Sequence, residues 1–392
     1  MRTKLFTVLA VAALGFTACS DDKKEPVTPQ PEGLTELKGN ITTSQSVKAG
    51  TITLDGATIV REGATLTIPA GTKIVAKNNS SYLLVERGAK IIAKGTADNP
   101  ITFTSASAKS GAWGGLIING KAPLSRANAS DPSSFGTEIN DNIFYGGSDV
   151  ADNSGELDYI VLEYTGANIS DDKEHNGLTL NGVGNGTKIS NIYIKDGADD
   201  GIEFFGGSVN VTNLLVVNSE DDMFDFTQGY SGTLKNAYGI WTAAFSTDEG
   251  DPRGVEADGN HDGNGSNHVG QSDFKMEDIT IVNNGTKNRG LDKDGKTINL
   301  MDDFIKVRRG AKASITNLLL KAPADNQYAF SDIIDFTDGK GIGNPASTIT
   351  YSFEPESKFN ASKIKAEGAT VTKNATSKGA NTSVFAWTKF TF

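Results

Sequence analysis

The chain has little of several features that mark common protein classes. Of its 392 residues one is cysteine and three are histidine, which argues against a disulfide framework and against a zinc site built on paired histidines. Acidic residues outnumber basic ones by 48 to 37, and the net charge of −11 argues against nucleic acid as a partner. No segment after about Gly50 keeps a helical period, so helices covering a parallel sheet are not expected.

The longest apolar run stands at the N-terminus. Residues 1–19 read MRTKLFTVLAVAALGFTAC, with two basic residues, an apolar run from Leu5 to Phe16 and small residues before Cys19. The run is too short to cross a bilayer and has the layout of a secretion signal, which predicts a signal peptide over residues 1–18. An unpaired thiol is a liability in an exported protein, so Cys19 is the predicted lipidation site. The alternative is an ordinary signal peptide with an incidental cysteine.

Two short motifs around this cysteine carry a resemblance. FTAC, which ends at Cys19, resembles the lipobox of bacterial lipoproteins, and the following SDDKKE resembles the signal that sends Bacteroidota lipoproteins to the outer face of the outer membrane. The resemblance implies a lipid-anchored, cell-surface protein of the outer membrane, with a transporter in that membrane as a candidate partner. Three prolines near Pro29 predict that residues 19–35 form the lipid anchor and a disordered linker.

The rest of the chain repeats itself at a short period. REGATLTI at Arg61 returns as ERGAKIIA at Glu86 after 25 residues, and SNIYIK at Ser190 returns as TNLLVV at Thr212 after 22. Units of this length, made of short β runs and turns, indicate a solenoid. We therefore predict an all-β fold, a right-handed single-stranded parallel β-helix over residues 36–392. Its last coils are expected to form a C-terminal cap, with SVFAWTKFTF as the closing strand.

Polar residues recur at one place in these units. A single Asn or Asp stands before a short apolar run in several successive units, where a corner residue commonly bonds the turn backbone. We interpret these residues as structural: Asn191, Asn213, Asn236, Asp278 and Asn317.

Longer stretches carry a family resemblance. REGATLTIPAGTKI, GTADNPITFTS, WGGLIINGKAPLS and DDGIEFFGGSVNVTNLLVVNSEDDMFDF resemble the sequence of right-handed β-helix lipoproteins of Bacteroidota, members of the broad pectin-lyase-like group. The resemblance runs from about Ala49 to Lys321. It implies the fold, but the group contains enzymes, binding proteins and adhesins, so it does not imply one activity.

Acidic residues also recur at one position of the repeat. In DGADDGIEFFGG and NSEDDMFDFTQG, strand alternation turns Ile202 and Phe204 inward and Glu203 outward. The same register predicts an outward column of Thr179, Glu203, Asp225, Glu256 and Lys306. Neighbouring like charges one coil apart repel by roughly 1 kcal/mol even in bulk water. A cation, partial protonation or one of the basic residues Arg253, Lys306 and Arg308 must compensate them. Glu203, Asp225 and Glu256 are the candidate ligand-binding residues; the alternative is a solvated acidic ridge.

A separate segment has the spacing of a calcium loop. In DGNHDGNG, the oxygen donors Asp258, Asn260, Asp262 and Asn264 fall at alternate positions, with a glycine at the sharp turn. The twelfth position holds Val269 where a bidentate glutamate is usual, so another carboxylate must complete the shell. The segment predicts Ca²⁺ as a cofactor, and its alternative is a polar surface loop.

The acidic doublets resemble catalytic motifs of polygalacturonases. ADDGIE and NSEDDMF look like that family's acidic motifs, which implies Asp200, Asp221 and Asp222 as the carboxylates that flank a glycosidic bond. The family's next motif, Gly-His-Gly, aligns with Tyr238–Trp241, which contains no histidine. As an alternative, a lyase would use Lys306, Arg308 or Arg309 as the base, and whether the chain is an enzyme stays open. The doublets also suit turns, where Asp accepts backbone N–H bonds.

These features together predict a surface protein that binds an extracellular ligand, such as a glycan or another nutrient, through an acidic, calcium-binding face. Two alternatives remain: a polysaccharide lyase or glycoside hydrolase acting on acidic glycans, and a structural or adhesion module. Aromatic residues are divided between two expected roles. Core ladders are expected for Phe204, Phe224, Phe226 and Phe274, and a sugar-stacking platform is the alternative to core packing for Phe205, Tyr230, Trp241, Phe245 and Trp113.

Overall fold

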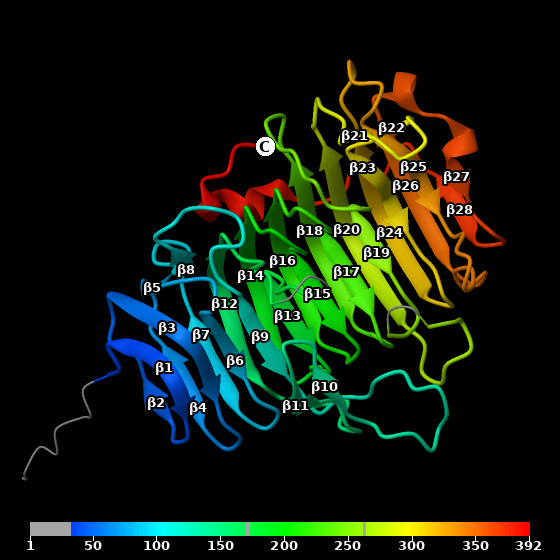
Figure 1. Cartoon of the computed structure of the whole chain (residues 1–392). Coiled ribbons are helices and arrows are strands. Elements are labelled where there is room, and N and C mark those ends of the chain that lie inside the picture. Colours follow the sequence, from blue (N-terminus) through cyan, green and yellow to red (C-terminus); the bar gives the residue numbers. More distant parts are fainter. Residues whose placement is uncertain (1–32, 170–172, 262–263) are drawn as a thin grey trace, which may run out of the picture. The chain divides into compact units, whose positions relative to one another are not determined.

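The computed structural model describes residues 33–169, 173–261 and 264–392 (Figure 1). The predicted signal peptide, the lipidation site Cys19 and nearly all of the predicted linker lie outside the described residues. Within the described ranges, no helix has both the length and the apolar character needed to cross a membrane.

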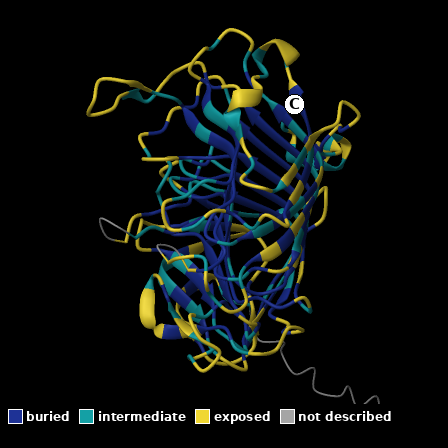
Figure 2. Cartoon of the chain, turned by 90° about the vertical axis from the view of Figure 1, so that its right-hand side faces the viewer, coloured by how far each residue is buried: buried dark blue, intermediate teal, exposed yellow. Residues whose placement is uncertain are grey.

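The described chain is a right-handed parallel β-helix. Most of its strands belong to one 21-stranded sheet whose neighbours pair in parallel, coil upon coil. The first coils contain β1 (Glu36–Ile41), β2 (Gln45–Ser46) and β3 (Thr51–Val60). Buried residues fill the interior of the coils, and exposed residues lie mainly in the turns and loops (Figure 2). The predicted fold class is therefore confirmed.

Successive coils place their strands in three columns. The first column is β6 (Tyr82–Val85), β9 (Leu116–Asn119), β13 (Leu178–Asn181), β15 (Ile202–Phe205), β17 (Phe224–Thr227) and β19 (Val255–Ala257). A smaller parallel sheet continues the coil sequence: β23 (Met301–Lys306), β25 (Phe330–Asp335) and β27 (Ile364–Lys365).

The other two columns share long, bent strands. They contain β4 (Thr65–Ile68), β5 (Lys73–Ala76), β7 (Lys90–Lys94), β8 (Ile101–Ser105), β12 (Gly155–Glu163), β14 (Lys188–Lys195), β16 (Asn210–Val217), β18 (Thr233–Trp241), β20 (Asp273–Asn283), β24 (Lys312–Lys321), β26 (Thr348–Glu354) and β28 (Thr370–Lys373). Two hairpins project from the coils: β10 (Phe135–Thr137) with β11 (Asn140–Tyr145), and β21 (Gly290–Leu291) with β22 (Thr297–Ile298). Short 3-10 helices are η1 (Glu356–Lys358), η2 (Ala361–Lys363) and η3 (Thr382–Thr388).

The two sequence repeats match the observed register. Ser190 in β14 lies opposite Thr212 in β16, and Thr65 in β4 lies opposite Lys90 in β7. Inward side chains then form continuous ladders, such as the stack of Phe204 on Phe226 with ring centroids 5.0 Å apart. Phe274 extends this stack at 4.4 Å from Phe226, as expected for a core ladder.

The corner residues form a polar ladder. Asn191, Asn213 and Asn236 all have left-handed backbone conformations, which asparagine adopts more readily than most residues. The Nδ2 group of Asn213 donates to Oδ1 of Asn191, and that of Asn236 donates to Oδ1 of Asn213, each at 2.9 Å. Asn317 likewise donates to Asp278 at 2.7 Å, so these five residues are structural as predicted, although their side chains bond one another.

The C-terminal segment differs from the prediction. Residues 383–392 do not form a closing strand, because Thr382–Thr388 is the 3-10 helix η3. This segment lies along the outer face of the bent strands, next to β16 (Figure 1). Phe385 is fully buried in a cluster with Leu215, Val217 and Tyr238. The physical reason is that these outward side chains are apolar, and the C-terminal segment removes them from water. The sequence prediction placed this segment at the end of the coil stack and did not consider the outer face of the strands.

Candidate functional site

A large groove lies over the first column of strands. Its volume is about 810 Å³, and hairpin β10–β11 contributes to its wall. Thirteen of the lining residues are acidic, whereas Lys173, Arg253 and Arg308 are the lysine and arginine residues of the lining. The acidic lining residues are Glu138, Asp141, Glu174, Asp199, Asp200, Glu203, Asp221, Asp222, Asp225, Glu249, Asp251, Glu256 and Asp258. The proportion of acidic residues is therefore much higher in the groove lining than in the whole chain.

The predicted outward column runs along the floor of this groove. Thr179 lies opposite Glu203, Glu203 opposite Asp225, and Asp225 opposite Glu256. The bridge between Asp258 and Arg308, two residues further on, places Lys306 next in the column. The ammonium of Lys306, however, contacts Asp335 at 2.9 Å and is absent from the groove lining. The structure thus brings together the three candidate ligand-binding acids and leaves Lys306 outside.

The second residue of each acidic doublet stabilises the coil stack. Oδ1 of Asp200 accepts the backbone N–H of Asp222 at 2.9 Å, and Oδ1 of Asp222 accepts that of Arg253 at 2.6 Å. Both aspartates are more than nine-tenths buried. Each carboxylate therefore links its own coil to the next, as the turn role predicts.

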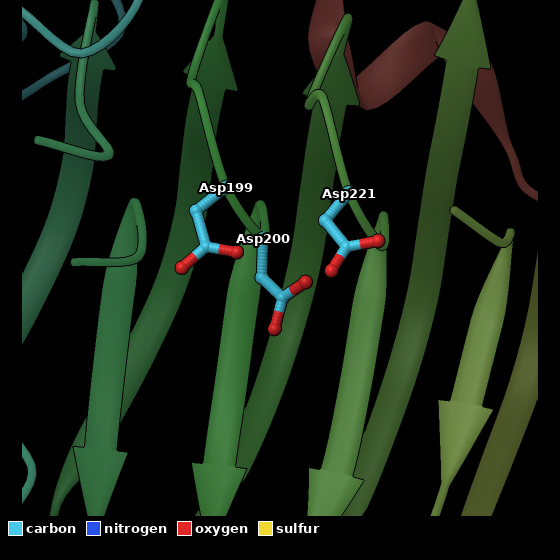
Figure 3. Close-up of side chains that lie close together, drawn as sticks. All are labelled: Asp199, Asp200 and Asp221. Atoms are coloured by element: carbon cyan, nitrogen blue, oxygen red, sulfur yellow. The ribbon is translucent and has the colours of Figure 1, made fainter. Parts of the chain in front are cut away.

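Asp199 and Asp221, the first residues of the two acidic doublets, both face the groove. Asp199 and Asp221 line the groove from successive coils, and Figure 3 shows both carboxylates close to that of Asp200. One oxygen from each of the three lies within 4.8 Å of the others. A second group of three, with the same spacing, consists of Asp200, Glu203 and Asp225. Asp200 is common to both groups, so the carboxylates form one continuous cluster.

Burial and mutual repulsion raise the pKa values of this cluster. Burial, followed by the charges of neighbouring acids, raises the pKa of Asp200, Glu203 and Asp225 well above the usual range. The pKa of Asp221 rises to about 8 for the same reasons. Burial raises the pKa of Glu256 to about 7, less than for its neighbours because Arg253 and Arg308 oppose the shift.

Two arginines neutralise the far end of the groove. The guanidinium groups of Arg253 and Arg308 both contact Glu256, and Arg308 also bonds Asp258 at 3.1 Å. Arg253 further contacts Asp303 at 3.3 Å. This end is a buried, mixed-charge network, unlike the purely acidic cluster near Asp200.

The structure corrects one alignment of motifs. The sequence aligns Tyr238–Trp241 with the histidine motif of polygalacturonases, but Tyr238 lies in β18 opposite Leu215, on another column. The coil after Asp222 reaches the groove at Arg253, whose carbonyl accepts the N–H of Met223. Arg253 therefore stands where the histidine motif was sought. Tyr238–Trp241 belongs to the next strand along the sequence, whereas the next strand of the groove column is β19, which the register of Glu256 identifies.

The residues of the predicted calcium loop make other contacts. Asp258 is paired with Arg308 and Arg309, and Nδ2 of Asn260 donates to the carbonyl of Gly265 at 2.8 Å. Asn264 is exposed and donates to the carbonyl of His261. Asp262 lies outside the described residues. Calcium at this loop stays a prediction: the carboxylate of Asp258 is engaged by arginines, whereas Oδ1 of Asn260 is buried and accepts no hydrogen bond.

Sequence reasoning missed several groove residues. Asn176 lies 3% exposed at the turn before β13 and donates to Glu203 at 2.5 Å. Its position before Gly177 corresponds to that of Asp200 before Gly201, so the repeat itself contained the signal. Tyr145 and Phe135 come from the β10–β11 region, whose sequence shows no repeat pattern that would predict contact with the groove.

The aromatic residues divide as the fold requires. Trp113, Tyr230 and Trp241 are fully buried, and Phe245 is 7% exposed, so the sugar-platform interpretation is wrong for these four. Their rings fill the coil interior, where apolar area is removed from water. Phe205 differs, because it lines the groove and contacts Tyr145 edge to face at 6.3 Å.

Comparisons with known proteins agree with this architecture. The model of the pectate-lyase-like β-helix domain family matches residues 39–391. A search of curated proteins and a search of solved structures each found no match. The matched segment covers most of the chain and includes every strand of the groove floor. The chain therefore belongs to the pectate-lyase-like β-helix domain family.

Proposed function

We propose that this protein is a lipid-anchored surface protein that binds an extracellular glycan in the acidic groove. The observation that carries the proposal is the groove itself, about 810 Å³ in volume and lined by carboxylates together with Phe135 and Phe205. Carboxylates accept hydrogen bonds from sugar hydroxyls, and aromatic rings provide apolar faces against which sugar rings pack. Membership of the pectate-lyase-like family supports a module related to glycans.

The charge of the groove restricts the class of glycan. An anionic polymer would be repelled unless cations accompanied it, whereas neutral or amino sugars need no such help. Arg253 and Arg308 do not reverse this preference, because their guanidinium groups already contact Glu256. We therefore expect neutral or basic sugars to bind in chelator, and uronic-acid polymers to bind only when divalent cations are present.

A glycan array followed by calorimetry tests the proposal. The purified chain should retain a subset of glycans, and Phe205→Ala should weaken that binding because it removes a ring from the groove. The matched control is Phe144→Ala, which removes a half-exposed ring from the nearby hairpin that is absent from the groove lining. Equal affinity of both variants and wild type, or no retained glycan, would contradict the proposal.

Hydrolysis is the second candidate, and one observation favours it. Asp221 lines the groove and has a pKa of about 8, so at neutral pH it holds the proton that a general acid must donate to a leaving group. Lyase chemistry has less support, since the ammonium of Lys306 is bonded to Asp335 and Arg308 is held by two carboxylates. If the wild-type protein releases reducing ends from a glycan and Asp221→Asn does not, the protein is a hydrolase. If it binds the glycan without forming any product, the protein is a binding protein.

The anchoring part of the proposal has its own test. Cys19→Ser should release the protein from the membrane fraction, because acylation at this cysteine is the proposed attachment. Protease treatment of intact cells should then degrade the anchored wild type if it is displayed on the surface. Copurification after mild crosslinking would identify a transporter partner, and recovery of the anchored protein alone would argue against one.

A further inference from the structure

The outward side chains of the first strand column change from apolar to polar at β13. Leu84 in β6 lies opposite Ile117 in β9, and Ile117 lies opposite Thr179 in β13. From Thr179 onward the column forms the polar floor of the groove, as far as Glu256. Leu84 and Ile117 are 0% and 2% exposed, and neither is among the described residues that line the groove. The groove floor therefore begins at β13, although the column also contains β6 and β9.

Hairpin β10–β11 covers the apolar part of this column. Ile143 of β11 is 7% exposed and forms a buried cluster with Leu84 and Ile117. Ile139, between the two strands of the hairpin, packs against the same cluster. Contact among these side chains removes apolar surface from water, so the hairpin is held on the column without any ligand.

The hairpin is also fastened at both edges of the strands that it crosses. At the edge where the strands end, Nη1 of Arg87, which follows β6, donates to the carbonyl of Gly146 at 2.8 Å. At the edge where the strands begin, Nζ of Lys173, which precedes β13, donates to the carbonyl of Glu138 at 3.0 Å. The same ammonium lies 3.8 Å from the carboxylate of Asp141. Because these contacts are at opposite edges, the hairpin crosses the whole width of the column.

The groove beyond the hairpin is short. Thr137 and Glu138 of the hairpin region line it, so the hairpin is a wall of the groove and not a separate projection. Three coil spacings of about 4.8 Å separate Thr179 from Glu256, which gives roughly 14 Å of polar floor. A glycan that follows the row of floor acids must stop at the hairpin, because passing over β9 would require Ile143 to leave its buried position.

We propose that hairpin β10–β11 is an end wall, so that the groove receives the terminal sugar units of a glycan and excludes internal segments of a polymer. The class of ligand is then a chain end or a short oligosaccharide. This inference rests on the proposed function, since it takes a glycan as the occupant of the groove. The closure of the groove, however, is a property of the protein alone and has a test that needs no glycan.

Calorimetry with glucosamine chains measures which part of a glycan is bound. The probes are a short glucosamine oligomer and a long glucosamine polymer, whose ammonium groups suit an acidic groove. Wild type should bind one protein per chain in both cases, so the number of binding sites per gram should fall in proportion to chain length. Several wild-type molecules bound along one polymer chain would overturn the proposal.

Two variants at neighbouring positions separate the end wall from other effects. Ile143→Asp puts a carboxylate into the apolar cluster and should detach the hairpin, so that several copies bind along one polymer chain. The matched control is Phe144→Asp, which adds the same charge at a half-exposed position and should still bind one protein per chain. One protein per chain in Ile143→Asp, with the hairpin shown to be detached, would also overturn the proposal.

Thiol labelling shows whether the hairpin is seated. In a Cys19→Ser chain an introduced thiol is the only one. Ile117→Cys should be labelled at least about tenfold more slowly than Phe144→Cys, because the hairpin covers that position, and Ile143→Asp should remove this protection. Fast labelling of Ile117→Cys with the hairpin otherwise unchanged would overturn the proposal. If Ile117→Cys is protected but neither glucosamine chain binds, glycan binding in the groove fails for amino sugars and the end wall stands.

Discussion

Removal of Arg308 should destabilise the protein strongly. Its guanidinium contacts Glu256 and Asp258, and all three side chains are about nine-tenths buried. Arg308→Met keeps much of the volume but removes the charge. Breaking a buried ion pair from one side costs about 3–5 kcal/mol, because a carboxylate is left without its counter-ion. Glu256 keeps Arg253 and Asp258 keeps Arg309, so we expect the lower end, about 3 kcal/mol.

Urea denaturation followed by circular dichroism measures this change in unfolding free energy. The matched control is Arg61→Met, since Arg61 pairs with Glu86 at 3.0 Å but has a side chain 42% exposed. Such a surface pair contributes about 0–1 kcal/mol. Lowering the pH from 7.5 to 5.5 should recover part of the stability of Arg308→Met, because Glu256, with a pKa of about 7 in wild type, takes up a proton. An equal loss of unfolding free energy in both variants, or a loss in Arg308→Met that does not change with pH, would refute the reasoning.

Three further predictions concern the acid cluster, the core and the corner. In chelator, the wild-type protein should become less stable as the pH rises from about 5 to 8. The pKa of Asp221 in the folded protein is raised to about 8, so folding favours the protonated carboxyl and this stability is lost on deprotonation. A melting temperature that rises over this pH range would contradict the prediction. Phe226→Ala should cost about 3–5 kcal/mol in chemical denaturation, because it empties a position stacked between two rings, whereas Phe144→Ala should cost less than about 0.5 kcal/mol. Asn213→Ala should be about 1 kcal/mol less stable than Asn213→Gly, since both lose the ladder bonds but alanine is strained at a φ of 59°; equal stabilities would argue against backbone strain.

The fold was predictable because its information is local and repeated. Glu203 and Asp225 occupy matching positions in segments 22 residues apart, and parallel pairing sets such positions side by side. Once the period was known, alternation gave the inward Phe204 and the outward Glu203 without further data. The corner ladder followed in the same way, since Asn191 and Asn213 repeat at the same interval.

The site was only partly predictable, because its remaining parts are not periodic. Arg253 follows a long loop after β18, yet the register that aligns Glu256 with Asp225 also sets it beside Asp222, as the structure confirms. Its further contact with Asp303 has no counterpart in the repeat. The hairpin residue Tyr145 meets Phe205 across 60 residues of sequence with no repeat to connect them. Asp258 resembled a calcium ligand in sequence, but Arg308, 50 residues later, occupies its carboxylate. Long-range contacts of this kind depend on loop paths that no local pattern specifies.

The C-terminal segment changes how the coil stack should unfold. In a simple solenoid each coil contacts only its neighbours, so the ends can fray one coil at a time. Here the backbone N–H of Lys378 bonds Asn317, that of Ala380 bonds Thr280 and that of Asn381 bonds Asn236, which lies 145 residues earlier. One short segment thus ties several coils together along the corner ladder. The last coils cannot detach without releasing it from the middle of the stack, which couples their unfolding into one cooperative event.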